Sequence, residues 1–447
     1  MSLPFTSRQL GPSGLALLCL LPVLAVAPAC NSVTAERIEA LKSAPGGRAA
    51  LQDILADEEV EVGLRAQAAG ALVEMGSAED MEATLAGLDL PGREALVPAL
   101  VPGLASLAQA PDPQKAADAR DALYTIRELV PREKARQAVD AVLFPALTEA
   151  LRKGQGGAPD SRTRDILNGI GAEAVGLVMP LLQDPEVPLE VPIAVIEKVG
   201  KIEDQENAGR ALVARAKQIS DIPEDLWPAL AKMGGKDAAA FLMTTVDEGS
   251  ARDAERAAAA MATMRRTPDV ASFAVKKAGS ATTDPALRES LFAVAEAQKN
   301  KEAQDALLAL IGRSLDAEVR HRAFAAVLKA GGGERLLEAL EAFPRSARYE
   351  AETFRQNIVE PVRKMPGFDT RGPLFKAMDS KSALARLVAV LVIGEMGFPS
   401  DAQHLAKLEK DKGTVPGLPP ADRVGRQASR MVDALEKKKK EKEKEAS

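Results

Sequence analysis

Few side chains in this 447-residue sequence are of the types and spacings that perform chemistry. The two histidines, His321 and His404, lie in separate helical segments, so they cannot form the paired ligands that zinc sites use. His321 also lies between Arg320 and Arg322, whose positive charges would repel a divalent metal ion. We therefore expect both histidines to face solvent, and we predict no metal site.

Motifs that signal catalysis are also missing from the sequence. It contains no Gly-x-Ser-x-Gly nucleophile turn and no phosphate-binding Walker loop. The glycine-rich stretch AGGGERL at 330–336 lies between two expected helices, without the preceding strand that a dinucleotide site requires. The acidic stretch ADEEVEV at 56–62 lacks the glycine of a calcium loop, and we expect it to be a helix start with first-turn acids. We predict no catalytic residue, no cofactor and no enzymatic activity.

The residue with a predicted chemical role is Cys30, at the end of an apolar leader. Residues 1–14 carry one charge, Arg8, and residues 15–29 are apolar, which is typical of a secretory signal peptide. The run is shorter than a membrane-spanning helix and is interrupted by Pro22 and Pro28. Cleavage after Ala29 would leave Cys30 as the first residue.

A cysteine at that place resembles the lipobox of bacterial lipoproteins, whose thiol receives a diacylglycerol. The usual lipobox has leucine three residues before the cysteine, and this sequence has Ala27 there. Cys19 lies within the leader, so Cys30 would be the only cysteine of the mature chain and no internal disulfide could form. The resemblance implies lipidation of Cys30 and a membrane anchor in the bacterial cell envelope. Asn31 after the cysteine favours the outer membrane, and a soluble secreted protein is the alternative.

Composition predicts an all-helical protein built from small aliphatic side chains. Apolar residues make up 46% of the chain but aromatic residues only 3%, with one Trp and two Tyr. Such cores suit close packing of helices. The formal net charge is −6, and the lysine-rich end makes the rest of the chain more acidic still. Nucleic-acid binders usually carry a basic stripe, so we expect no nucleic-acid partner.

A repeat of about 32 residues runs along the sequence. DPALRESLFAVAEAQ from Asp284 and DAEVRHRAFAAVLKA from Asp316 share their pattern, and Arg256, Arg288 and Arg320 recur at the same interval. A second marker is an apolar residue followed by glycine, which recurs at Gly76, Gly171, Gly200, Gly234, Gly331 and Gly397. About eleven such units fit the mature chain.

One unit explains why the repeat has this length. Asp316 is suited to cap a helix, and an apolar face follows it until glycines 331–333 end that helix. The face consists of Val319, Ala323, Phe324, Val327 and Ala330. A second helix is expected from near Glu334 until Pro344 stops it. A hairpin of two short helices cannot bury both apolar faces alone, so units must stack.

These residues resemble the HEAT-type α-solenoids, in the short form known as phycobilisome-lyase-like HEAT repeats. The likeness rests on SALARLVAVLVIGEMG from Ser382 and on Asp316, Val319, Arg320, Ala323, Ala326 and Gly331. Tetratricopeptide repeats would need more aromatic residues, and a coiled coil would not tolerate so many glycines and prolines. The resemblance covers most of 45–410 and implies an all-α superhelix of stacked hairpins.

The resemblance also implies roles for particular residues. Arg256, Arg288 and Arg320 would each pair with an acid of a neighbouring unit, or alternatively form a basic stripe for an acidic partner. Trp227 is expected to fill the seam between units, with a partner-binding anchor as the alternative.

The leader and the repeat array together are compatible with three functions: a protein-binding scaffold anchored in the envelope, a structural spacer, or a bilin-lyase-like enzyme. The scaffold is our main interpretation, and its protein partner is not identifiable from the sequence.

The predicted organisation has five parts. A signal peptide (1–29) precedes a lipidated linker and first helix (30–44). The repeat array spans 45–410, and a proline-rich loop with a terminal helix follows at 411–435. Within the array, loops are expected at 153–160 and 365–373. The segment 436–447, rich in Lys and Glu, is expected to be a disordered tail or a frayed extension of the last helix.

Overall fold

The computed structural model describes residues 33–154, 157–264, 268–365 and 371–445. Every regular element in these ranges is helical, and none of the residues there belongs to a strand. The expected signal peptide and Cys30 lie outside the described residues. None of the helices within the described ranges is long and apolar enough to span a bilayer.

The first half of the described chain consists of α-helices of seven to 21 residues and one 3₁₀ helix of five residues. In chain order they are α1 (Ala35–Leu41), α2 (Gly47–Ala56), α3 (Val62–Glu74), α4 (Ala78–Gly87), α5 (Leu90–Ala108), α6 (Pro113–Leu129), α7 (Glu133–Lys153), α8 (Gly157–Ile170), α9 (Ala172–Val178), the 3₁₀ helix η1 (Met179–Gln183), α10 (Glu190–Val199), α11 (Ile202–Ala216) and α12 (Leu226–Met233).

The second half continues the same pattern and adds short 3₁₀ and π segments. Its elements are α13 (Gly235–Glu248), α14 (Ala251–Thr263), α15 (Pro268–Ala278), α16 (Pro285–Gln298), α17 (Lys301–Arg313), α18 (Ala317–Gly331), η2 (Gly332–Arg335), α19 (Leu336–Ala342), α20 (Ala351–Phe354), η3 (Arg355–Val359), α21 (Glu360–Arg363), α22 (Arg371–Met378), α23 (Ala383–Met396), η4 (Pro399–Asp401), α24 (Ala402–Ala406), η5 (Pro420–Asp422) and α25 (Val424–Glu445).

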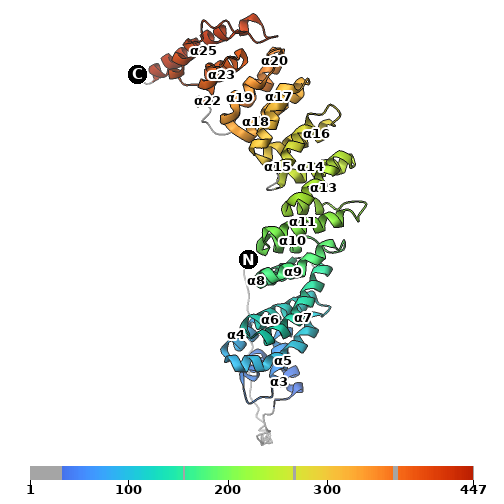
Figure 1. Cartoon of the computed structure of the whole chain (residues 1–447). Helices are drawn as coiled ribbons and strands as arrows, with labels where there is room; N and C mark the ends of the chain where they lie inside the picture. The colour runs from blue at the N-terminus through green and yellow to red at the C-terminus, as the bar shows by residue number, and fades with distance from the viewer. Residues whose placement is uncertain (1–32, 155–156, 265–267, 366–370, 446–447) are drawn as a thin grey trace, which may run out of the picture.

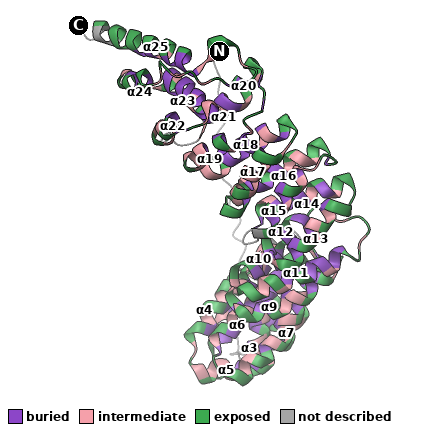
Figure 2. Cartoon of the chain, turned by 45° about the horizontal axis from the view of Figure 1, so that its top comes forward, coloured by how far each residue is buried: buried purple, intermediate pink, exposed green. Residues whose placement is uncertain are grey.

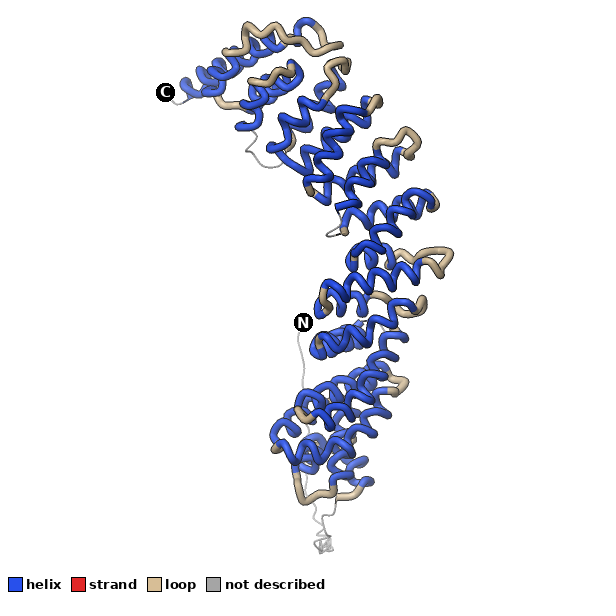
Figure 3. Tube along the Cα trace, viewed as in Figure 1, coloured by secondary structure: helices blue, strands red, loops and turns tan. Residues whose placement is uncertain are grey.

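The helices form two layers that follow one curved path. As far as α19, each even-numbered helix contacts the next even-numbered one, and the odd-numbered helices do the same, with η1 bridging α9 and α11. Consecutive helices pack across the two layers as hairpins. Figures 1 and 3 show the resulting arc, with the chain progressing steadily from one end to the other. The protein is therefore an α-solenoid of stacked helical hairpins, as the sequence predicted.

The hydrophobic core is a seam that runs the length of this arc between the layers. Figure 2 shows buried residues inside the stack and exposed residues on its outer sides. Leu, Val, Ile and Ala supply most of the seam, as the composition requires. Trp227 on α12 is buried in the same seam, which confirms that it belongs to the core. Burial of apolar surface at each junction stabilises the stack by roughly 25 cal/mol per Å².

The unit that begins at Asp316 shows how local chemistry sets the helix ends. The Asp316 carboxylate accepts the backbone N–H of Glu318 at 2.8 Å, which confirms the predicted N-cap. α18 continues to Gly331, and Gly332 has the left-handed φ of 59° that ends it. The second helix, α19, begins at Leu336 rather than near Glu334, because the 3₁₀ turn η2 occupies the intervening residues.

The predicted glycine marker is confirmed at some helix ends and not at others. Gly76, Gly171 and Gly234 have φ values of 71°, 76° and 67°, in the region that favours glycine. Gly200 and Gly397 instead have extended backbones with φ near −75°. The marker therefore identifies helix ends, but only some of these ends require glycine for conformational reasons.

The loop expected at 153–160 is shorter than predicted, because α8 begins at Gly157. The proline-rich stretch after Asp89 is one helix of 19 residues, α5, which includes Pro98 and Pro102. At the end of the described chain, α25 continues to Glu445, which agrees with the second of the two alternatives, an extension of the last helix. Its i, i+4 Glu–Lys spacing and high helix propensity explain the extension.

Candidate functional site

Cys30, the residue with a predicted chemical role, lies outside the described residues. The first described helix, α1, begins at Ala35 with Thr34 as its N-cap. Lipidation of Cys30 therefore stays a prediction.

The three arginines of the 32-residue period do not share one role. Arg256 pairs with Glu224, an acid 32 residues earlier, as the resemblance implied. Among the described residues, no acid pairs with Arg288 or Arg320, and both instead donate hydrogen bonds to backbone carbonyls. The expected ladder of pairs between units is therefore wrong for these two residues. On α18 the ion pairs to the preceding unit are made by Arg322, with Glu289 at 2.7 Å, and by Lys329, with Glu296 at 3.2 Å.

Four arginines that each lie four residues after an N-cap share a structural task that sequence reasoning missed. Each donates to a carbonyl that precedes its own helix in the chain: Arg65 to Leu55 at 2.9 Å, Arg288 to Thr283 at 3.2 Å, Arg320 to Leu315 at 2.9 Å and Arg386 to Ser380 at 2.6 Å. Carbonyls in such loops have lost their helical partners and need a donor. These hydrogen bonds stabilise the turns between helices, which explains why the arginines recur at corresponding positions.

The two histidines differ in exposure. His404 is exposed and lies beside Phe375, with ring centroids 4.5 Å apart, as expected for a solvent-facing side chain. His321 is buried, which contradicts the expectation, and its ring lies 6.1 Å from that of Tyr349. Burial lowers the pKa of His321 below its ordinary value, and the adjacent Arg320 lowers it further. His321 is therefore a buried residue whose surroundings favour the neutral imidazole.

The acidic stretch 56–62 also differs from expectation. Asp57 to Val60 lie in the loop between α2 and α3, and Glu61 is the N-cap, so the acids precede the helix and do not form its first turn. The Asp57 carboxylate accepts the backbone N–H of Glu59 at 2.9 Å and so shapes this turn. Among the residues that the structure describes, no group of three or more metal-ligating side chains could hold an ion.

The strongest candidate for a ligand site involves a buried arginine that the sequence analysis did not single out. In the part of the chain that the structure describes, four arginines are buried: Arg65, Arg120, Arg127 and Arg215. Three of them have partners, because Arg65 and Arg215 donate to backbone carbonyls and Arg127 binds carboxylates. Arg120 is only 2% exposed, yet its Nε and Nη2 atoms have no hydrogen-bond partner among the described residues.

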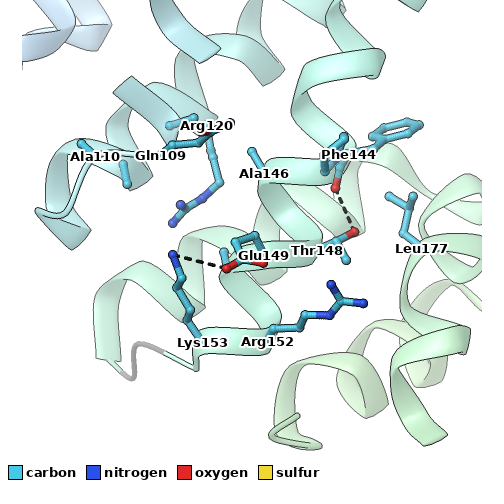
Figure 4. A pocket seen from close by; sticks show the side chains of 14 residues that line it. Gln109, Ala110, Arg120, Phe144, Ala146, Thr148, Glu149, Arg152, Lys153 and Leu177 are labelled. Carbon is cyan, nitrogen blue, oxygen red and sulfur yellow. Dashed lines mark hydrogen bonds and ion pairs between the residues drawn. The ribbon is translucent and has the colours of Figure 1, made fainter. Parts of the chain in front are cut away.

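Arg120 lines a pocket of about 690 Å³ between α5, α6 and α7. In Figure 4 its guanidinium leaves α6 and points toward Glu149 and Lys153 on α7, which pair with each other at 3.3 Å. Arg152 and Leu177 line the other side of the pocket. The volume is in the range of pockets that hold small ligands or short peptide segments.

The electrostatics of the pocket favour an anion. Burial lowers the pKa of Arg120 below its ordinary value, and the carboxylates of Asp121 and Asp160 offset this only in part. An arginine stays charged even so, and an unpaired buried ion carries a desolvation cost on the order of several kcal/mol. With Arg152, Lys153 and Glu149, the pocket has a formal charge of +2.

The pocket lining consists mainly of charged and aliphatic side chains. Thr148 is the only hydroxyl residue among the lining residues, and its Oγ1 donates to the carbonyl of Phe144 at 2.9 Å. The lining contains no histidine or cysteine that could act as a base or nucleophile.

A sequence signal for the site existed. Ala116, Arg120, Leu123 and Arg127 follow at spacings of four, three and four, so both arginines occupy the buried face of α6. Charged residues at such positions are rare unless they are paired.

Comparisons with known proteins give a distant likeness only. No protein-family model and no curated protein matches the sequence. Among solved structures, the karyopherin Kap121p bound to the SUMO protease Ulp1p matches 92% of this chain and 47% of its own, at 12% identity and a TM-score of 0.39. The chain thus spans about half the length of Kap121p.

Two further structures match at the same identity of 12%. A homology model of the full-length AP-3 complex matches 89% of this chain and 79% of its own with a TM-score of 0.40, and the Pds5–Scc1 complex matches 90% and 73% with a TM-score of 0.32. Likeness of this size carries no argument about function. The solenoid fold rests on the helix contacts of this chain itself.

Proposed function

We propose that this protein is a lipid-anchored scaffold of the bacterial envelope whose solenoid binds a partner protein. The observation that carries the proposal is the unbroken stack from α1 to α25, which leaves both layers of helices exposed over the whole arc (Figures 1 and 3). Repeat proteins of this architecture offer extended surfaces suited to binding other chains. With few aromatic anchors, the interface would be broad and polar.

The anchor is tested by labelled palmitate and membrane fractionation of the full chain. We expect the wild-type protein to carry label and to fractionate with membranes, and Cys30→Ala to lose both. Cys19→Ala is the matched control, because this cysteine lies in the leader and its loss should leave labelling intact. Unlabelled wild-type protein in the soluble fraction would contradict the envelope anchor.

The scaffold function is tested by crosslinking in intact cells, followed by purification from membranes. We expect one partner to be recovered repeatedly with the wild-type protein and to be lost when surface residues of the array are altered. A structural spacer is the competing function, and the length of the arc favours it. Removal of two adjacent central hairpins with retained function would support the spacer and oppose a specific binding surface.

A further inference from the structure

Arg120 differs from its nearest counterpart on the same helix. Arg127 is equally buried, two turns further along α6, and its guanidinium contacts Asp140, Glu128 and Glu173. Arg120 has the same exposed fraction but no hydrogen bond from its Nε or Nη2 to any described residue. The acids of the chain therefore contact one buried arginine of α6 directly, whereas the other lines a pocket, and Asp121 and Asp160 act on its charge without hydrogen bonds to its Nε or Nη2.

The unpaired donors of Arg120 define what the pocket would bind. A guanidinium presents its N–H groups in a planar fork that matches the two oxygens of a carboxylate or phosphate. Lys153 on the next helix adds a second cation beside this fork. An anion in the pocket would supply the partner that the fold itself does not give to Arg120.

The remaining lining favours a carboxylate over a phosphate. Glu149 lies among the pocket cations, and its negative charge would repel a doubly charged ligand more than a singly charged one. Phe144, Ala146 and Leu177 provide an apolar wall on which an aliphatic side chain could pack. A glutamate or aspartate flanked by an apolar residue has this combination of charge and shape.

We propose that the pocket around Arg120 binds an acidic side chain of a partner polypeptide, with its carboxylate on the Arg120 guanidinium and a neighbouring aliphatic residue against Phe144 and Leu177. The choice of a polypeptide rests on the proposed scaffold function. The site itself rests on the buried, unpartnered arginine and on the pocket that it lines.

The test uses two blocked peptides that differ in one group, acetyl-Leu-Glu-Leu-amide and its Gln counterpart, titrated into the purified full-length protein by calorimetry. We expect the Glu peptide to bind at least about tenfold more tightly than the Gln peptide, because a charge-assisted hydrogen bond is lost in the latter. Arg120→Met should abolish this preference. Arg210→Met, on α11 and outside the pocket, removes the same charge and should leave it unchanged.

Three outcomes would overturn the proposal. Equal affinity for the two peptides would show that the protein does not recognise the carboxylate. Undiminished binding of the Glu peptide by Arg120→Met would show that the binding site lies elsewhere. Inorganic phosphate that binds at the pocket when the Glu peptide does not would replace the carboxylate with a phosphate ligand. Circular dichroism and a melting curve establish that Arg120→Met is folded, since we expect its stability to equal or exceed that of the wild type.

Failure of the scaffold function gives a different result. The Glu peptide would still bind at Arg120, but crosslinking in cells would recover no partner. A partner that is recovered equally well with Arg120→Met would support the scaffold function. It would also show that this partner does not bind through the pocket around Arg120.

Discussion

The two buried arginines of α6 should respond to the same substitution in opposite ways. Arg127→Met removes a guanidinium whose Nε donates to Asp140 at 2.6 Å and whose Nη2 donates to Glu173 at 2.5 Å. Arg120→Met removes a guanidinium for which the described residues supply no partner to Nε or Nη2. Methionine keeps much of the aliphatic stem in both cases, so the comparison isolates the charge and its contacts.

The loss of stability expected for Arg127→Met can be estimated from how exposed the two carboxylates that bind Arg127 are. The side chain of Asp140 is 18% exposed and would become a largely buried carboxylate without a counter-ion, whereas that of Glu173 is 60% exposed and would be solvated by water. Breaking one side of a buried pair costs about 3–5 kcal/mol, while an exposed pair contributes about 0–1 kcal/mol. We therefore expect Arg127→Met to lower the free energy of unfolding by about 3 kcal/mol or more, nearly all through Asp140.

For Arg120→Met the expected change is zero or a gain in stability. The substitution removes the desolvation cost of an unpaired buried ion and leaves no carboxylate without its hydrogen-bonding partner. Its neighbour Asp121 keeps the ion pair with Arg162.

Urea unfolding followed by circular dichroism measures both variants, and amide hydrogen exchange across α6 to α9 locates the change. Local exchange matters because repeat arrays can open unit by unit rather than in one step. The double variant Arg127→Met with Asp140→Asn is the control: it should recover part of the loss, since the orphaned charge is gone. Equal losses for Arg120→Met and Arg127→Met would refute the assignment of an unpaired charge at Arg120.

Three further predictions follow from other contacts of the described chain. Gly209→Ala should destabilise the protein by about 1–3 kcal/mol, because the new methyl group would overlap the carbonyl oxygen of Gly234. Gly70→Ala, where the methyl group would enter open space, should stabilise its helix by about 0.5–1 kcal/mol. Melting curves compare the two variants, and equal shifts of the melting temperature would contradict the close approach of Gly209 to Gly234. The stability of the wild type should fall as pH drops below the ordinary histidine pKa of 6.5, because the unfolded chain binds a proton that the buried imidazole of His321 resists. His321→Gln should make the urea midpoint depend less on pH between about pH 7.5 and about pH 5. An unchanged slope would show that other groups cause the dependence. Tyr349→Phe should leave the free energy of unfolding unchanged or raise it by up to about 1 kcal/mol, because the buried hydroxyl of Tyr349 has no hydrogen-bond partner among the described residues. A loss above about 1 kcal/mol in urea unfolding would show that this hydroxyl makes a hydrogen bond.

Much of the fold could be predicted from the sequence because its determinants are local. Asp316 caps α18 because a carboxylate at that position reaches backbone N–H groups two and three residues ahead, whatever the rest of the chain does. Spacings of three and four between apolar residues determine which face of each helix is buried. A period of about 32 residues then requires stacking, because a single hairpin cannot bury both faces.

The candidate site could not be predicted in the same way. The alternation of apolar residues along α6 places Arg120 and Arg127 on its buried face, but both arginines look alike in the sequence. Asp140 and Glu173, which neutralise Arg127, come from α7 and α9, and only the packing of these helices brings them to one guanidinium and not to the other. The same holds for His321, whose burial depends on Phe343 and Tyr349 in the segment after α19.

The sequence by itself determined that this chain is helical, that it repeats and that its units must stack, since capping, helix propensity and apolar spacing act over a few residues. Only the tertiary structure decided which charges are paired, because pairing depends on distances between helices that lie tens of residues apart in the chain. For this reason the periodic arginines divide between two roles, since Arg256 makes an ion pair whereas Arg288 and Arg320 donate to carbonyls of turns. Arg120, which lies outside the period, has no partner for its Nε or Nη2 among the described residues and lines a pocket.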